Sequence, residues 1–291
     1  MWAVDGLANF LPYAGLPLLL FVPVAMRIRR RVLAMMLALP ALLYVLVLLS
    51  PNLFLALPDD VPETSPRLRV VTANVLMSNT DLDRLAEDIL AQAPDVVVFE
   101  ELTRAIEAFS PALAAAYPHR VATEVPWVTL ASRWPLEDAR VLPIADGDRA
   151  RDLLAASVVV GGTRVSLVAV HFMPPLDGEA YRTNAAQRAV LQAEVDATPG
   201  PLMVVGDFNA TTLSPSFARL LSGTGLRIAT SSRLAEPTYY AYGRFGVRID
   251  HVLVRGVTVA EEAAFDLTGS DHRGLVVEVG LPAPERAAAT R

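Results

Sequence analysis

The 291-residue chain contains no cysteine and no lysine, because all 25 of its basic residues are arginine. The absence of cysteine excludes disulfides, zinc–thiolate sites and thiol nucleophiles. The absence of lysine excludes a Schiff base, a lysine general base and the lysine of a phosphate-binding P-loop. Any chemistry of this chain therefore depends on carboxylate, imidazole, amide, hydroxyl and guanidinium groups.

The larger part of the chain also lacks a basic charge balance. Residues 1–57 contain one acid, Asp5, against four arginines and sum to +3, so the total of −6 leaves −9 for residues 58–291. A protein that binds nucleic acid through its phosphates normally has a basic surface. The acidic balance disfavours nucleic acid as a partner, although a local arginine patch is compatible with it.

Long hydrophobic runs are confined to the first 57 residues, although 53% of the whole chain is hydrophobic. Residues 7–24 have one polar side chain, Asn9, apart from the hydroxyl of Tyr13, and residues 32–49 have no charge. Either run would form a helix of about 27 Å, close to the roughly 30 Å of a hydrocarbon core. We therefore predict two transmembrane helices, over residues 7–24 and 32–49.

A basic turn at residues 26–31 separates the two runs. Arginine-rich loops face the cytoplasm, so this hairpin predicts a multi-pass cell-membrane protein, bound to the lipid bilayer, whose C-terminal region is extracytoplasmic. A signal peptide is disfavoured, because no positive charge precedes the first run. Buried helices of a soluble protein are the other alternative, and Pro12, Pro17 and Pro23 make the first run the weaker span.

After the hairpin, residues 58–66 are expected to form a linker, residues 67–281 a folded domain and residues 282–291 a flexible tail. The domain alternates short apolar runs with amphipathic ones, and Gly161 and Gly162 indicate a hairpin turn. Strands are expected near residues 68–72, 95–99, 127–131, 156–160, 165–170, 202–205, 249–254 and 275–279. Helices are expected after residue 80 and over residues 181–197. This order predicts an α/β fold with mixed sheets.

Polar side chains collect at the ends of these apolar strands. They are Asn74, Glu100, Glu101, His171, Asp207, Asn209, Asp250, Asp271 and His272. Taken singly, each has an ordinary explanation as a turn residue or a solvated carboxylate. Six such strand ends with carboxylate, amide and imidazole groups together indicate a site, because layered folds gather their sites at strand ends.

The motifs that carry these residues resemble the endonuclease/exonuclease/phosphatase superfamily, the fold of pancreatic deoxyribonuclease, apurinic endonucleases, neutral sphingomyelinases and inositol polyphosphate 5-phosphatases. The resemblance covers residues 67–281. It rests on Val-Thr-Ala-Asn at 71–74, Pro-Asp-Val-Val-Val-Phe-Glu-Glu at 94–101, Ala-Ser-Arg-Trp-Pro at 131–135, Val-His at 170–171, Val-Val-Gly-Asp-Phe-Asn at 204–209, Arg-Ile-Asp at 248–250 and Gly-Ser-Asp-His at 269–272. It implies a four-layer α/β sandwich with two mixed β-sheets, preceded here by the transmembrane hairpin.

The resemblance also implies a Mg²⁺-dependent phosphoesterase, with Mn²⁺ as the alternative ion. The implied metal contacts are Asn74, Glu101 and Asp271, and the implied catalytic residues are His171, Asp207, Asn209, Asp250 and His272. The family commonly has Gln-Glu where this chain has Glu100 and Glu101, which leaves the ligand open between the two. We assign the role to Glu101, because strand alternation points Glu100 to the other face.

Individual roles follow from the same resemblance. Asp207 and Asn209 are expected to orient the attacking water and to bind the phosphate. His272 is expected to contact the scissile phosphate, while Asp250 orients its ring and stabilises its charged form. His171 argues against the apurinic branch, which has other residues at this position.

The expected function is hydrolysis of a phosphodiester or phosphomonoester by water attack, with a lipid headgroup or a small phosphoester as the substrate. An extracytoplasmic nuclease acting on DNA or RNA is the alternative, because it would share every motif. A catalytically inactive binding module is disfavoured by the retention of all eight positions. The hydrophobic pair alone has little support as the functional unit, because it carries no intramembrane charge.

Overall fold

The computed structural model describes residues 2–10, 13, 16–27, 32–33, 35, 37–38, 40–42, 60–102, 109–125, 127–145, 151–229, 236–241 and 245–283. Within these residues, two six-stranded mixed sheets face each other. The first sheet has the order β13–β14–β1–β2–β4–β3. Its strands are β1 (Arg67–Asn74), β2 (Val96–Glu100), β3 (His119–Ala122), β4 (Val128–Ser132), β13 (Thr258–Asp266) and β14 (Arg273–Gly280).

The second sheet has the order β5–β6–β7–β8–β12–β9. Its strands are β5 (Glu137–Leu142), β6 (Leu153–Val160), β7 (Thr163–His171), β8 (Leu202–Asp207), β9 (Arg227–Ile228) and β12 (Asp250–Arg255). A separate two-stranded ribbon pairs β10 (Tyr239–Ala241) with β11 (Phe245–Val247).

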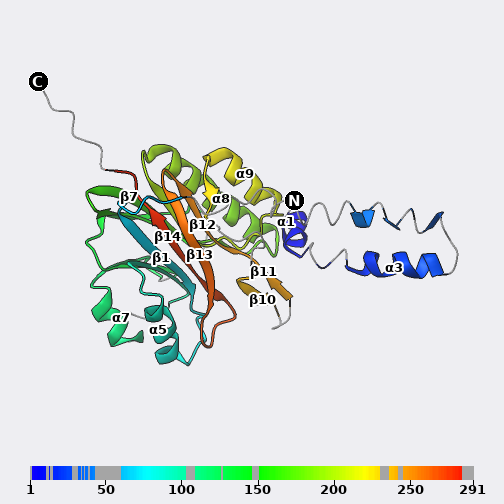
Figure 1. Ribbon diagram of the computed structural model, residues 1–291, viewed down its shortest axis with the longest axis horizontal. Helices are drawn as coiled ribbons and strands as arrows, with labels where there is room; N and C mark the ends of the chain where they lie inside the picture. Colours follow the sequence, from blue (N-terminus) through cyan, green and yellow to red (C-terminus); the bar gives the residue numbers. More distant parts are fainter. Residues whose placement is uncertain are drawn as a thin grey trace, which may run out of the picture.

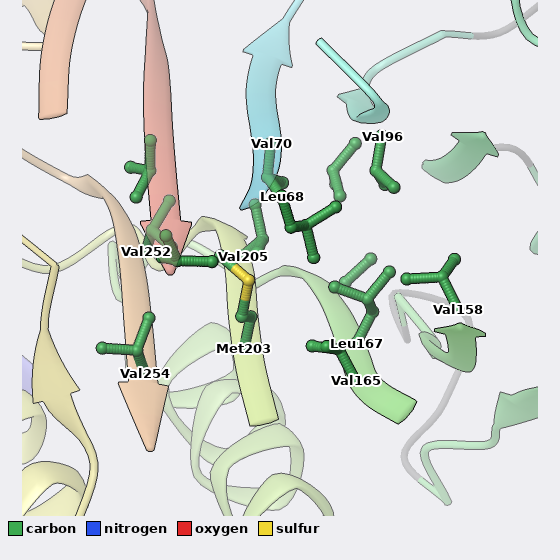
Figure 2. Packing of buried hydrophobic residues seen from close by; sticks show 14 of the residues in the cluster. Leu68, Val70, Val96, Val158, Val165, Leu167, Met203, Val205, Val252 and Val254 are labelled. Atoms are coloured by element: carbon green, nitrogen blue, oxygen red, sulfur yellow. The ribbon is translucent and has the colours of Figure 1, made fainter. Parts of the chain in front are cut away.

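The main core lies between the two sheets. Branched side chains such as Val70 and Val96 of the first sheet meet Leu167, Met203 and Val252 of the second, all fully or almost fully buried (Figure 2). The strands that carry them are covered on both faces, which explains why their sequences are nearly continuous apolar runs. This packing fixes the two sheets relative to each other.

Helices cover the outer face of each sheet (Figure 1). The first sheet packs against α5 (Leu82–Ala91) and α7 (Pro111–Ala116), where Leu85, Ile89 and Leu113 are fully buried. The second packs against α8 (Gly178–Ala197) and α9 (Pro215–Thr224), through Leu191 and Phe217 among others. The layer order helix, sheet, sheet, helix confirms the predicted four-layer sandwich.

The N-terminal region differs from the expectation. Instead of one helix over residues 7–24, the structure has α1 (Trp2–Asn9) and α3 (Leu16–Arg27). Pro12, which cannot donate a helix hydrogen bond, lies between them in the sequence. In addition, α1 buries the polar side chains of Asp5 and Asn9. The predicted single span is therefore wrong in its bounds.

None of the helices formed by the described residues is long and apolar enough to cross a membrane. Residues 32–49, the second predicted span, fall largely outside the described part of the chain, as do residues 284–291 of the predicted tail. Residues 60–66, the described part of the predicted linker, contain no helix or strand. In Figure 1, α1 lies at the edge of the sandwich, and α3 extends away from it.

Candidate active site

The register of the strands brings the predicted site residues together. In the first sheet β1 and β2 are parallel, and Asn74 pairs with Glu100. In the second sheet β7 and β8 are parallel, and His171 pairs with Asp207. The antiparallel β12 begins beside the end of β8, so that Asp250 also pairs with Asp207. Strand ends from both sheets therefore deliver their polar side chains to one edge of the sandwich.

Gly206 permits the close approach of β8 to β7. Its φ of 142° lies in a region that side chains rarely adopt, and a Cβ there would be 1.9 Å from the carbonyl oxygen of Val170. A larger residue would push β8 away from β7. The glycine of the Gly-Asp-Phe-Asn motif is thus needed to keep Asp207 beside His171.

Glu101 faces the site, as predicted. Its carboxylate accepts hydrogen bonds from the amide of Asn74 at 3.3 Å and from the backbone N–H of Met77 at 3.1 Å. Its backbone φ is 62°, a left-handed conformation that is strained for a glutamate. Strain of this kind gathers at functional sites, so the conformation supports a role for Glu101 in the chemistry.

Glu100 lies in the interior beneath the site and does not line the cavity. It is fully buried, and its Oε1 accepts a hydrogen bond of 2.7 Å from the hydroxyl of Thr72. Burial, together with the negative charges of Asp250 and Asp207, raises the pKa of Glu100 well above its usual value. The sequence indicated only that Glu100 points away from Glu101, and gave no sign of this carboxyl group beneath the site.

Asp207 and Asn209 form one hydrogen-bonded unit. The Asp207 carboxylate accepts from the backbone N–H of Asn209 at 2.7 Å and from its amide group at 3.0 Å. The same amide also donates to the carbonyl of Phe172 at 2.8 Å. These bonds fix the orientation of the Asn209 side chain, whose backbone is left-handed with a φ of 49°. Burial and then the charge of Asp250 raise the pKa of Asp207.

His272 and Asp250 form a buried ion pair. Nδ1 of His272 lies 2.9 Å from Oδ2 of Asp250. Burial alone would lower the pKa of His272, but the charge and hydrogen bond of Asp250, with Asp207 as a further neighbour, raise it to about 10. The imidazole is therefore charged at neutral pH. The hydroxyl of Ser270 accepts the backbone N–H of His272 and donates to the carbonyl of Asn74, which ties this turn to the end of β1.

His171 is neutral, in contrast to His272. Burial and then the positive charges of Arg151 and His272 lower the pKa of His171 well below its usual value. Its Nε2 lies 3.6 Å from Oδ2 of Asp207 and 3.8 Å from Oε1 of Glu101. The site thus combines one neutral and one charged imidazole, and the charge state of each is determined by its neighbours.

Arg151 and Trp127 are site residues that the sequence did not reveal. A guanidinium nitrogen of Arg151 lies 2.5 Å from Nε2 of His171, and the guanidinium lies over the Trp127 ring at 4.4 Å from its centre. The Trp127 ring also meets the edge of the His171 ring at 5.9 Å. Arg151 follows no motif, so only its position in the fold identifies it as a cation at the site.

The polar groups open into one cavity of about 660 Å³. It is lined by Glu101, Arg151, His171, Asp207, Asn209, Asp271 and His272, together with apolar residues that include Phe10, Pro174, Pro175, Leu176, Tyr239, Val247 and Ile249. Asp271 is the last predicted metal contact, and it shares this cavity with Glu101. The cavity therefore has a charged floor and a largely apolar surround.

The donor set fits a hard divalent cation. Glu101 and Asp271 offer carboxylates to the cavity, while Asp207, Asp250 and Glu100 add buried acids nearby. A cation would offset this carboxylate repulsion, and oxygen donors of this kind suit Mg²⁺. Asp207, Asp250 and His272 also have donor atoms within 4.8 Å of one another. Of these three residues, Asp250 and His272 are already bound to each other.

His251 lies apart from the chemistry, although it follows Asp250 in the sequence. It is fully buried, its Nε2 lies 2.9 Å from the carbonyl oxygen of Ala210, and its ring packs on Phe217 at 4.5 Å. Burial and then the charge of Arg248 lower the pKa of His251 to about 3. His251 is thus a neutral core residue.

This burial predicts acid sensitivity. The unfolded chain binds a proton at His251 near pH 6.5, whereas the folded chain resists it until about pH 3. Stability should therefore fall as pH drops below 6.5, with a contribution from His251 of about 1.4 kcal/mol per pH unit. Urea unfolding at pH 8, 6.5 and 5 should show a shallower pH dependence for His251→Gln than for the parent. Equal slopes would contradict the prediction.

Comparisons with known proteins agree with this geometry. The model of the Endonuclease/Exonuclease/phosphatase family matches residues 71–272. No curated protein sequence matches the chain. Among solved structures, an endonuclease/exonuclease/phosphatase from Beutenbergia cavernae is 24% identical with a TM-score of 0.62, over 74% of this chain and 72% of that one.

Two further structures differ in their named activities. Sphingomyelinase C from Streptomyces griseocarneus is 22% identical with a TM-score of 0.55, over 75% of this chain and all of that one. A 3'-5' exonuclease from Neisseria meningitidis is 19% identical with a TM-score of 0.58, over 72% of this chain and 98% of that one. At these identities the likeness shows the fold and does not select a substrate. The family match over residues 71–272 shows that the chain belongs to the endonuclease/exonuclease/phosphatase family, whose members hydrolyse phosphoester bonds.

Proposed function

We propose that the protein is a divalent-metal-dependent phosphoesterase that hydrolyses a phosphodiester or phosphomonoester by attack of water. The observation that carries the proposal is the convergence of Glu101, His171, Asp207, Asp271 and His272 on one cavity. A phosphoester is anionic, and the carboxylates of the site would repel it. A cation is therefore needed before the site can accept a phosphoester. Bound Mg²⁺, or Mn²⁺ as the alternative, would polarise the phosphoryl oxygens and offset the charge that develops on them.

The protein side chains would bind the cation and position the water and the phosphate. Asn74, Glu101 and Asp271 would hold the cation. Asp207 and Asn209, joined by two hydrogen bonds, orient the attacking water and the phosphate. This rigid unit is the kind of positioning on which phosphoryl transfer depends.

The two imidazoles and the arginine act on the phosphate itself. The charged His272, held by Asp250, stabilises the negative charge of the transition state. Arg151 places a second positive charge beside His171 and the cavity. The neutral His171 accepts a hydrogen bond from Arg151 at Nε2 and so holds this cation beside the cavity.

We further propose a lipid headgroup or a small phosphoester as the substrate. The net charge of −9 on residues 58–291 and the apolar surround of the cavity both favour a compact or amphipathic phosphoester over long nucleic acid. The hydrophobic runs near the N-terminus support attachment to a membrane, and the basic turn at residues 26–31 supports a catalytic domain outside the cytoplasm. An extracytoplasmic nuclease is the second candidate, since the 3'-5' exonuclease from Neisseria meningitidis shares the fold.

A substrate comparison with the full chain in mild detergent tests this choice. Sphingomyelin, phosphoinositides, a soluble aryl phosphodiester, plasmid DNA and single-stranded RNA would be tested with Mg²⁺, with Mn²⁺ and with EDTA. Asp207→Ala serves as the blank. We expect turnover of a lipid or small ester to exceed that of DNA and RNA. Preferential turnover of DNA or RNA would replace the lipid proposal with the nuclease, and turnover of nothing above the blank would favour an inactive binding module.

A further inference from the structure

The N-terminal helix α1 is attached to residues 209–216, which follow β8, by hydrogen bonds of two polar side chains on one of its faces. Asp5 and Asn9 are four positions apart, which places them one above the other on a helix. Both are buried, at 2% and 8% exposure, whereas Leu7 between them is 72% exposed. The helix therefore turns its polar face to the sandwich, the reverse of what its hydrophobic sequence suggests.

Asn9 binds the segment that contains the catalytic asparagine. Its amide donates to the backbone carbonyl of Asn209 at 3.2 Å, and its Oδ1 accepts from the backbone N–H of Thr211 at 2.9 Å. The two bonds bracket the residue after Asn209, where the chain leaves its left-handed turn. The Asn9 side chain thus holds this turn in place through hydrogen bonds to its backbone.

Asp5 anchors the helix next to this contact. Its Oδ1 accepts from the hydroxyl of Ser214 at 2.8 Å and from the backbone N–H of Ser216 at 2.9 Å, at the start of α9. Burial alone would raise the pKa of Asp5, but the hydrogen bonds from Ser216 and Ser214 hold it below its usual value. The dipole of α9 also favours a carboxylate such as Asp5 at its first turn. These contacts hold α1 in the position in which Asn9 can bind the loop.

The same helix contributes to the cavity. Gly6 and Asn9 of α1 line it beside the catalytic groups, as does Phe10, which follows the helix. A Cβ on Gly6 would lie 3.5 Å from the carbonyl oxygen of Pro175, so the helix backbone approaches the loop after β7 closely. Just beyond α1, the hydroxyl of Tyr13 donates to the carbonyl of Gly246 in β11 at 2.6 Å. Gly6, Asn9, Phe10 and Tyr13 therefore contact the cavity rim on several sides.

We propose that α1 is an integral part of the active site, in which Asn9 is the positioning residue for Asn209. The inference rests on the proposed function, since it assigns to Asn209 a role in binding the reacting phosphate and water. It makes the hydrophobic N-terminal region part of the catalytic unit and not only an attachment. A domain that begins near residue 66 would then lack one wall of its own cavity.

The test compares Asn9→Ala with Leu7→Ala in the full chain, in the same detergent and with a soluble aryl phosphodiester as substrate. Asn9→Ala removes both hydrogen bonds, and we expect kcat to fall about tenfold or more, with KM changed by less than about threefold. Asn9→Asp keeps the acceptor for Thr211 and loses the donor to Asn209. Its kcat should therefore lie between that of Asn9→Ala and that of the parent. Leu7→Ala, on the exposed face of the same helix, should match the parent. Equal kcat for Asn9→Ala and Leu7→Ala would overturn the proposal.

Hydrogen exchange supplies a readout that is independent of activity. In Asn9→Ala, the backbone amide of Thr211 loses its acceptor and should exchange at least about tenfold faster, while the amides of β8 stay protected. Unchanged exchange at Thr211 would overturn the proposal even if kcat fell. If the parent shows no turnover above Asp207→Ala, the proposed function fails, but the exchange result still decides whether Asn9 holds the Asn209 turn.

Discussion

Glu101→Gln in the full chain is expected to lower metal-dependent turnover by about 10³-fold, equivalent to roughly 4 kcal/mol of transition-state stabilisation. Glutamine has the same shape and retains an oxygen that can accept from Met77, so the strained backbone has no steric reason to move. What is lost is the negative charge that Glu101 presents to the cavity. The expected signature is a raised half-saturating Mg²⁺ concentration together with reduced kcat, measured by titrating Mg²⁺ at saturating substrate.

The neighbouring Glu100→Gln is the matched control, because it makes the same chemical change one residue earlier. Glu100 is buried beneath the site, and its pKa is raised well above the usual value, so its charged form is disfavoured by folding. The amide should keep the bond from Thr72 and leave turnover within about threefold of the parent. In EDTA at neutral pH the variant should unfold at a higher temperature, because glutamine does not have to take up a proton on folding as the buried Glu100 does. If Glu100→Gln lost activity and Glu101→Gln kept it, the ligand assignment would move to Glu100.

Asp250→Asn is expected to lower kcat by about 10³-fold at pH 8. The substitution keeps the size of the side chain but removes the charge that raises the pKa of His272 to about 10. A raised pKa means that the imidazolium is present below pH 10 and is lost as pH rises through that value. Without Asp250, burial lowers the pKa of His272 and only the charges of Asp207 and Asp271 still raise it, so the charged form should be lost at a lower pH than in the parent. The alkaline limb of the kcat/KM profile should shift toward acid.

Asp266→Asn is the control for this prediction. Asp266 lies in β13, its side chain is 93% exposed, and it pairs with Arg273 next to His272. Such an exposed pair contributes about 1 kcal/mol or less. Its loss should leave the alkaline limb in place. An Asp250→Asn variant with the parent profile would show that Asp250 does not hold the charge of His272, and the proposed role of the ion pair would fall.

The central strands could be predicted from sequence because their physical situation is simple. β1, β2, β7 and β8 are buried on both faces, so they appear as short apolar runs rich in valine. A polar residue that follows such a run stands out against it. That contrast identified the site positions, and the register of the strands then accounts for their proximity.

Edge strands could not be predicted in the same way. Every residue of β5 but the last is exposed, and in β3 exposed residues alternate with half-buried ones. Their sequences therefore resemble loops, since an edge strand has little apolar surface to bury. The place of Arg151 in the site could not be predicted either, because its partners His171 and Trp127 are close in space and distant in sequence.

The N-terminal region is difficult to interpret from sequence because apolar residues far outnumber its polar ones. By composition, Asp5 is only one charge and Asn9 an isolated polar residue in an apolar run. In the structure these two side chains form the contact with the loop at residues 209–216. A polar residue in a hydrophobic segment is costly to bury without a partner. That rule is the signal that could have pointed to a docking role for both.

Metal-dependent hydrolysis at this cavity is tested most directly by turnover of a soluble aryl phosphodiester by the purified full chain. We expect hydrolysis in Mg²⁺ or Mn²⁺, its loss in EDTA, its recovery when the metal is restored, and no turnover by Asp207→Ala under any of these conditions. Hydrolysis that persists in EDTA, or that Asp207→Ala retains, would contradict a metal-dependent reaction at the site formed by β1, β2, β7, β8 and β12.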